Sequence, residues 1–181
     1  MGDVFFDNNL APISINNETT IRRQSIIGKL IEIIAADSVS NINLKRDPAE
    51  IDLKIKHNNL NKFQWVISEY TNNAIFIESA IHELNLAIMN GSTKFKRQMK
   101  QFYLESLDKF NIETKPVNMD KLRVNSDNIV QDVIDKTRNF LNKSVLLDDA
   151  IYQEDVEYGI TLITSYSIIE CVVLETPNVN D

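Results

Sequence analysis

The chain is short of the residues on which several protein classes depend. It has one cysteine, four glycines, four prolines and one tryptophan in 181 residues. A single cysteine excludes an internal disulfide, so we expect a reducing, cytoplasmic setting. An all-β sandwich or barrel needs many tight turns, and so few glycines and prolines are too few to form them. No stretch reaches the roughly 18 apolar residues of a membrane-spanning helix, and no signal peptide is evident, so we expect no membrane association.

The composition that is present favours one folded, helical unit. Hydrophobic residues make up 43% of the chain and charged residues 25%, which is the balance of a globular protein and not of a disordered one. A chain of this length suits a single hydrophobic core. We therefore predict a single helical domain over residues 17–176, preceded by an irregular N-terminal arm over residues 1–16 and followed by a disordered tail over residues 177–181.

A seven-residue repeat of apolar side chains runs from Leu53 to Ile88. A helix that carried the whole repeat would be roughly 54 Å long, and such a rod must pack against other helices. Its flanking positions hold few charges, which favours the core of a bundle over a two-stranded coiled coil. The polar run His57-Asn58-Asn59 leaves open whether one helix or two cover residues 48–90. The first register of the repeat comprises Leu53, Leu60, Ile67, Ala74, Ile81 and Ile88. The second register, offset by three residues, comprises Phe63, Tyr70, Ile77 and Leu84.

Apolar stripes and capping signals predict further helices before and after this repeat. The first begins near Asn17 or Thr20, and another follows Gly91. A third begins at Ser126, and the last runs from about Asp155 to Leu174. The sequence therefore predicts an all-α bundle of about five to six helices built around one long central helix.

Charge is distributed unevenly along the chain, whose net charge is -7. Residues 144–181 carry acids but no lysine or arginine. Conversely, Lys94, Lys96, Arg97 and Lys100 crowd the start of a helix, where cations oppose the helix macrodipole. Such a cluster is a candidate for nucleic-acid contact, although a solvated face or docking onto the acidic C-terminal segment is commoner. The chain as a whole lacks the basic footprint of a free-standing DNA-binding protein.

No catalytic, metal-binding or cofactor-binding pattern is complete. His82-Glu83 begins a zinc-protease helix motif, but Leu86 stands where the second histidine belongs. Neither His57 nor His82 follows an arginine at the spacing of HEPN-type helical ribonucleases. Cys171 has no histidine within reach on its own helix, which disfavours a nucleophile. We therefore expect no cofactor, no metal and no enzymatic activity.

Three stretches together resemble a known family. Residues 48–60 (PAEIDLKIKHNNL) lead into Glu69-Tyr70, and the chain closes with residues 167–177 (SIIECVVLETP). This pattern is similar to the helical C-terminal domain of bacterial ABC-three-component systems, whose members pair an "I.HNN" segment with a terminal helix ending in "C..LE.P". The resemblance covers roughly residues 45–178.

The resemblance implies a role in a defence complex. In that family the domain couples an effector, often a nuclease, to an SMC-like ABC ATPase in anti-phage or anti-plasmid defence, as in Lamassu-type systems. Only about 45 residues precede the matching region here, so we expect a stand-alone accessory subunit that meets DNA through the complex, with homo-oligomerisation left open. The residues expected at partner contacts are Val4, Phe5, Phe6, Trp65, Phe76, Asp148 and Asp149.

Two other functions stay open at this point. The chain could be a small helical enzyme or toxin that acts on nucleic acid, with His57, His82 and Glu83 as its only plausible polar actors. It could also be an antitoxin or a phage-encoded inhibitor, a role that a small acidic chain also suits.

Overall fold

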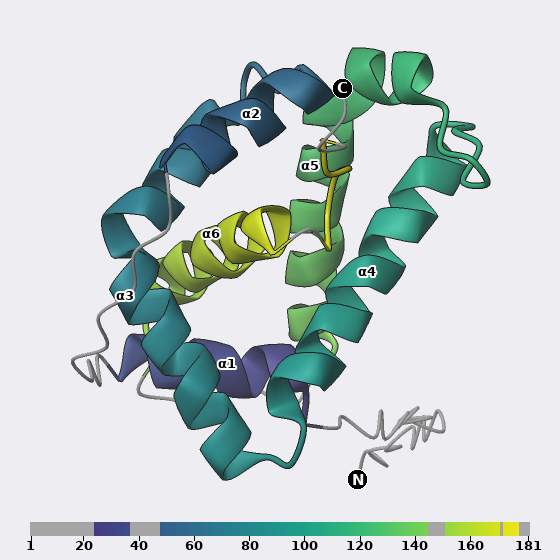
Figure 1. Cartoon of the computed structure of the whole chain (residues 1–181). Helices are drawn as coiled ribbons and strands as arrows, with labels where there is room; N and C mark the ends of the chain where they lie inside the picture. The colour runs from purple at the N-terminus through teal and green to yellow at the C-terminus, as the bar shows by residue number, and fades with distance from the viewer. Residues whose placement is uncertain (1–23, 37–47, 145–150, 171, 178–181) are drawn as a thin grey trace, which may run out of the picture.

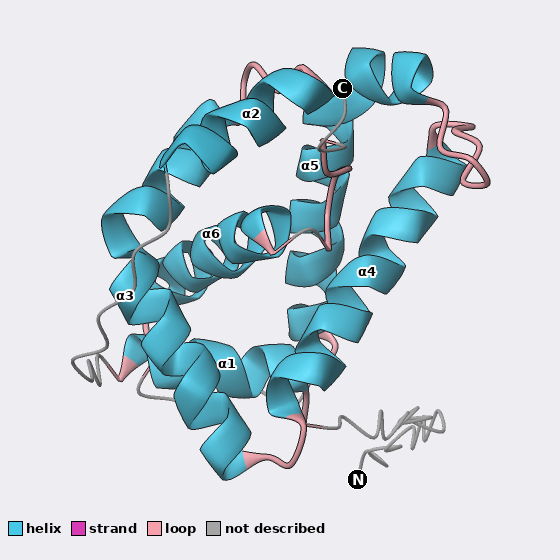
Figure 2. Ribbon diagram, viewed as in Figure 1, coloured by secondary structure: helices cyan, strands magenta, loops and turns pink. Residues whose placement is uncertain are grey.

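The structure is a computed structural model that describes residues 24–36, 48–144, 151–170 and 172–177. Helices make up 77% of these residues, and no strand occurs among them (Figures 1 and 2). The prediction of an all-α fold with about six helices is therefore confirmed. None of the helices in the described ranges is long and apolar enough to cross a membrane. The helices are α1 (Ile26–Ala35), α2 (Pro48–Asn58), α3 (Gln64–Ala87), α4 (Gly91–Lys109), α5 (Met119–Asn142) and α6 (Gln153–Ile169).

The apolar repeat is divided between α2 and α3, so of the two alternatives that the sequence left open, the structure shows two helices. The helix α2 ends at Asn58, and Asn59 has a φ of 53°, a left-handed conformation that asparagine tolerates better than most residues. The Oδ1 atom of Asp127, on α5, then accepts hydrogen bonds from three successive backbone N–H groups at 2.8–3.2 Å. This carboxylate satisfies donors that would otherwise lack partners at the start of α3. Two helices with a capped break therefore cover residues 48–87.

The helix at the centre of the bundle is α6. Figure 1 shows it running between α3 and α5, and it packs against α1, α3, α4 and α5. Ten of its 17 residues are buried, and the buried hydroxyls of Ser165 and Ser167 donate to backbone carbonyls of α6 itself at 2.7 Å. Gly159 permits close approach of α1, because a Cβ atom there would lie 3.1 Å from Cγ1 of Ile31. The helix α3, which carries most of the apolar repeat, lies against α6 and also packs against α1, α2 and α4.

Two predicted helix boundaries differ from the structure. The helix expected to begin at Ser126 begins at Met119, because the Asn118 side chain accepts from the N–H of Lys121 at 3.1 Å and caps an earlier start. The last helix ends at Ile169 and not near Leu174, which has a φ of 64°. The remaining segment, residues 172–177, leaves α6 and returns along the bundle.

The described residues do not include all of the predicted segments. The N-terminal arm over residues 1–16, the caps expected at Asn17 or Thr20, and residues 178–181 of the expected tail lie outside them. Within the described part, α1 begins after Ser25, whose side chain accepts from the N–H of Gly28 at 2.9 Å.

Candidate functional site

The two segments that carry the family resemblance meet in the structure. The side chain of Asn58, at the end of α2, is fully buried and bonds both backbone groups of Glu175. Its Nδ2 atom donates to the Glu175 carbonyl at 2.8 Å, and its Oδ1 atom accepts from the Glu175 N–H at 3.0 Å. The same Nδ2 atom also donates to the carbonyl of Lys54 at 2.9 Å. One amide thus fixes a residue that lies 117 positions further along the chain.

The side chain of Glu175 is held from a second helix. The hydroxyl of Tyr103, on α4, donates to Oε1 of Glu175 at 2.9 Å. Burial, together with the nearby Glu175 carboxylate, raises the pKa of Tyr103 far above its usual range, so the hydroxyl remains a proton donor at every physiological pH. We call Asn58, Tyr103 and Glu175 the C-terminal clasp. The clasp therefore joins α2, α4 and the C-terminal segment.

The residues that flank Asn58 join the same corner to α5. Arg123 donates from Nε to the carbonyl of His57 at 2.8 Å, and Ser126 donates from Oγ to the carbonyl of Asn59 at 2.9 Å. Each residue of the His57-Asn58-Asn59 run thus accepts a hydrogen bond, through its backbone or its side chain, from another part of the bundle. The run His57-Asn58-Asn59, which belongs to the resemblance, therefore connects α2 to α5 and to the C-terminal segment.

Two of the four cations expected to contact nucleic acid, Lys96 and Lys100, are half-buried against other side chains. Lys96 places its Nζ atom 2.6 Å from Oε2 of Glu170 and 5.6 Å from the centre of the Tyr166 ring. Lys100 lies over the ring of Tyr103, with Nζ 4.8 Å from the ring centre. Docking onto the acidic C-terminal region, one of the alternatives that the sequence leaves open, is therefore observed for Lys96.

The other two cations, Lys94 and Arg97, point away from these contacts. Both side chains are exposed, and neither forms an ion pair within the described ranges. They lie three positions apart on α4, which places them on one face of the helix. Candidate nucleic-acid contact on α4 is thus concentrated at Lys94 and Arg97.

A buried carboxylate connects α4 to α5. Asp132 accepts from Oγ of Ser106 at 2.7 Å and from Nζ of Lys109 at 2.5 Å, and Lys136 also pairs with it. Burial acts to raise the pKa of Asp132, but the hydrogen bonds from Lys109, Lys136 and Ser106 outweigh it, and so the pKa lies below its ordinary value. The carboxylate consequently stays ionised at neutral pH, which suits a structural cross-link better than a proton-transferring acid.

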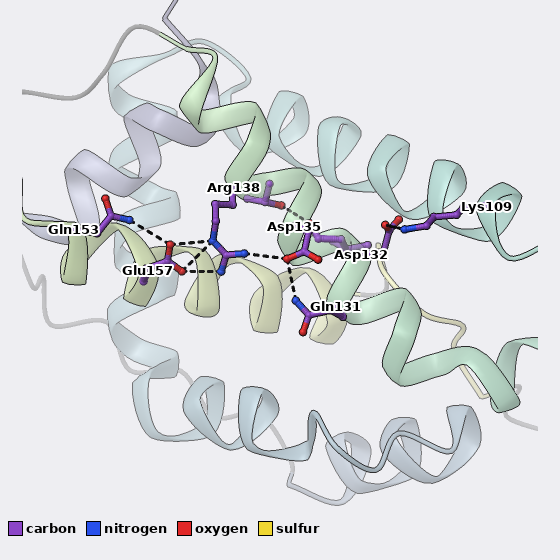
Figure 3. Close-up of polar contacts among 9 residues, drawn as sticks. Lys109, Gln131, Asp132, Asp135, Arg138, Gln153 and Glu157 are labelled. Carbon is purple, nitrogen blue, oxygen red and sulfur yellow. Dashed lines mark hydrogen bonds and ion pairs between the residues drawn. The ribbon is translucent and has the colours of Figure 1, made fainter.

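A second ion pair continues from α5 to α6, as Figure 3 shows. Arg138 forks onto Glu157 with N–O distances of 2.8 and 2.9 Å, and its third nitrogen donates to Asp135 at 2.9 Å. Gln131 donates to Asp135, and Gln153 donates to Glu157. The hydrogen bond from Arg138 holds the pKa of Glu157 below its usual range. Together with the Asp132 cluster, these contacts form what we call the α5 ionic network.

The residues of the enzymatic alternative are not brought together by any contact of the structure. His57 is the penultimate residue of α2, whereas His82 is an exposed residue of α3 next to the half-buried Glu83. Within the described part of the chain, no group of three or more His, Cys, Asp or Glu side chains could hold a metal ion.

The apolar residues expected at partner contacts differ in exposure. Trp65 is 53% exposed and lies 6.4 Å from the ring of Phe63, centre to centre. Phe76 is half-buried and packs against the core. Ile75 and Leu86 are also exposed on α3, at about 15 and 31 Å along the helix from Trp65. The other expected contacts, Val4, Phe5, Phe6, Asp148 and Asp149, lie outside the described residues.

Sequence reasoning assigned no role to the residues of the clasp or of the ionic network. Asn58 and Glu175 stood inside the stretches that carry the resemblance, and that was the one signal available for them. Asp132 lies between Val130 and Val133, at a position that is polar in any amphipathic helix, so its burial leaves no signal in the sequence.

No family model, curated protein or solved structure matches this chain.

Proposed function

We propose that the chain is a non-enzymatic accessory subunit that links an SMC-like ABC ATPase to an effector nuclease in an anti-phage or anti-plasmid defence complex. The observation that supports this role best is the contact between Asn58 and Glu175, because it joins the two segments on which the family resemblance rests. A contact between two distant stretches that both carry the resemblance is what a structural core shared by a family would produce.

The exposed apolar surface of α3 supports a role in assembly. Trp65 is 53% exposed beside the ring of the half-buried Phe63, and such exposed aromatic surface is of the kind that contact sites use. Trp65 is the strongest candidate anchor, because tryptophan is enriched among the residues that dominate interface energies. We assign the contact with a partner subunit to this end of α3.

Co-purification tests the proposal. The tagged chain, expressed with the products of the genes adjacent to its own, should retain an ATPase subunit with a long coiled coil and a nuclease subunit. Trp65→Asp should reduce the retained partners at least about tenfold, since central aromatic anchors contribute 2 kcal/mol or more to binding. Tyr152→Asp is the matched control, because Tyr152 is likewise an exposed aromatic residue, 75% exposed, and precedes a different helix, α6. A chain that elutes alone and monomeric contradicts the proposal.

Within this complex, we assign the contact with DNA to Lys94 and Arg97. Replacing both by glutamine should weaken binding of the assembled complex to a labelled duplex at low salt and reduce its salt dependence, because fewer counterions are released. Lys121→Gln is a suitable control, since Lys121 is already paired with Glu113 at 2.7 Å. Unchanged binding by the double variant removes α4 from the nucleic-acid interface.

A further inference from the structure

The corner between α3 and α4 exposes two large apolar side chains. Leu86 is 69% exposed near the end of α3, and Met89 is 79% exposed in the turn that follows. Figure 1 shows this turn at the periphery of the bundle, where α3 ends and α4 begins. A single exposed apolar residue is ordinary on a protein surface, whereas two within one turn form a small apolar patch that is open to a ligand.

The turn that carries this patch is fixed by short contacts between the two helices. The N–H of Ser92 donates to Oδ1 of Asn85 at 2.9 Å, which joins the start of α4 to the end of α3. Gly91 lies so close to α3 that a Cβ atom there would be 2.7 Å from the carbonyl oxygen of Leu84. Glycine is therefore required at this position. The exposed side chain of Met89 consequently stands on a rigid support.

The same corner is positively charged, although the whole chain is acidic. Residues 84–104 contain four lysines or arginines and no aspartate or glutamate. Two of these cations, Lys94 and Arg97, are exposed in the first two turns of α4. The positive end of the helix macrodipole adds to their charge. Charge complementarity therefore favours an anionic ligand at this corner.

The polar side chains of the corner distinguish between two kinds of anionic ligand. Asn85, Asn90 and Thr93 are exposed and alternate with Leu86 and Met89 along the chain. Polar groups of this kind are costly to insert into the hydrocarbon of a membrane. Asparagine and threonine are, by contrast, common hydrogen-bonding partners of phosphates and base edges in DNA. The corner therefore suits DNA better than a lipid surface.

We propose that Leu86 and Met89 form an apolar wedge that enters a groove of duplex DNA and opens a base step, while Lys94 and Arg97 bind the neighbouring phosphates. Leucine and methionine are among the side chains that DNA-bending proteins insert between base pairs. The wedge rests on the DNA contact in the proposed function and specifies its ligand. The preferred ligand is a duplex with a step that is easily unstacked, because opening such a step costs less free energy.

Binding to a mismatched duplex tests the wedge. Two fluorescein-labelled duplexes, identical except for one T-T mismatch, are titrated at low salt with the full-length chain and with the co-purified complex. The mismatched duplex should bind at least about tenfold more tightly, because part of the unstacking cost is already met. Met89→Ser should bring the two affinities within about twofold of each other, and Leu86→Ser should reduce the preference to a smaller extent.

A spectroscopic signal separates a wedge from simple phosphate binding. A fluorescent aminopurine base beside the mismatch becomes brighter when it is unstacked, so its emission should rise with the unaltered chain and not with Met89→Ser. Val124→Ser is the matched control, because Val124 is also an exposed apolar residue. Its neighbour Arg123 contacts His57, which precedes α3, whereas Leu86 lies at the other end of α3. If Met89→Ser keeps the mismatch preference or the rise in emission, the wedge is wrong.

The outcomes also separate failure of the wedge from failure of the proposed function. If replacing Lys94 and Arg97 weakens DNA binding but Met89→Ser leaves the mismatch preference intact, the wedge alone is overturned. A chain that shows the preference but retains neither an ATPase nor a nuclease supports the wedge and contradicts the defence-complex role. Binding to phosphatidylglycerol vesicles without binding to either duplex overturns both the wedge and the DNA contact.

Discussion

The α5 ionic network and the C-terminal clasp both join segments that are distant in the sequence, but with different chemistry. The network uses full charges, and several of its side chains are well exposed: Lys109 is 58% exposed and Glu157 is 40% exposed. The clasp uses a fully buried neutral amide and a phenol held in its protonated form. We therefore expect the network to respond to pH and salt, and the clasp to respond to the identity of its side chains.

The largest loss of stability in this comparison is expected at Asn58. Asn58→Ala removes both partners of the Glu175 backbone and leaves an N–H and a carbonyl without their hydrogen bonds. An unsatisfied buried group costs about 1–3 kcal/mol, and because these two groups are part-buried each should cost about half of the upper value, so we expect the free energy of unfolding to fall by about 3 kcal/mol. Urea denaturation followed by circular dichroism measures the loss.

A neighbouring asparagine provides the matched control for that variant. Asn61→Ala removes only an exposed hydrogen bond to the carbonyl of Asn59, and it should change stability by no more than about 0.5 kcal/mol. Equal losses for the two variants would show that the buried amide of Asn58 has no special role.

A smaller, pH-dependent loss is expected at Asp132. Its pKa is depressed in the folded state, so its contribution is present above the unfolded pKa of about 3.9 and is lost as the pH falls through the lower folded value. Asp132→Asn should lower stability at pH 7 by about 2 kcal/mol, because Lys136 and Ser106 lose a charged partner. The variant should also lose stability less steeply than the unaltered chain below pH 4.

Denaturation midpoints between pH 2 and pH 7 measure this effect. If the curves of the two proteins run parallel throughout that range, Asp132 does not carry the acid sensitivity assigned to it.

The smallest loss of stability is expected when Arg138 is replaced. Its pair with Glu157 is bidentate but partly exposed to solvent, and such pairs contribute about 0.2–1 kcal/mol. Arg138→Ala should therefore cost less than about 1 kcal/mol at low ionic strength, and the difference should shrink in 1 M salt. Arg123→Ala, which removes one hydrogen bond to a backbone carbonyl and no ion pair, should show no comparable salt dependence.

The helical class and most helices could be predicted from the sequence, whereas the arrangement around α6 could not. Periodicity identified Ile67, Tyr70, Ile77 and Leu84 as inward-facing, and all four are buried. The same reasoning left open whether a helix continues through residues 59–63, because the polar run His57-Asn58-Asn59 allowed a break but did not require one. The side chain that caps the start of α3 belongs to Asp127, on α5, and such a distant partner cannot be read from the local pattern.

The clasp and the ionic network were beyond sequence reasoning for a related reason. Hydrogen bonds from Asn58 to Glu175 and from Tyr103 to Glu175 join positions more than 70 residues apart, and nothing in the local pattern specifies such a pairing. The resemblance drew attention to the segments that contain Asn58 and Glu175, but it did not predict that these two residues are in contact. The cluster at Lys94–Lys100 was recognised as basic, yet its division between inward and outward cations depends on where Glu170 and Tyr166 lie.

Native-state hydrogen exchange tests most directly whether the Asn58 amide holds the C-terminal segment in place. In the unaltered chain, the amide of Glu175, which donates to Asn58, should be protected from exchange. In Asn58→Ala its protection should fall by more than that of core amides such as Val133 of α5, because only Glu175 loses its hydrogen-bond acceptor. If the substitution lowers the protection of Glu175 and Val133 equally, or leaves that of Glu175 unchanged, the role assigned to Asn58 is wrong.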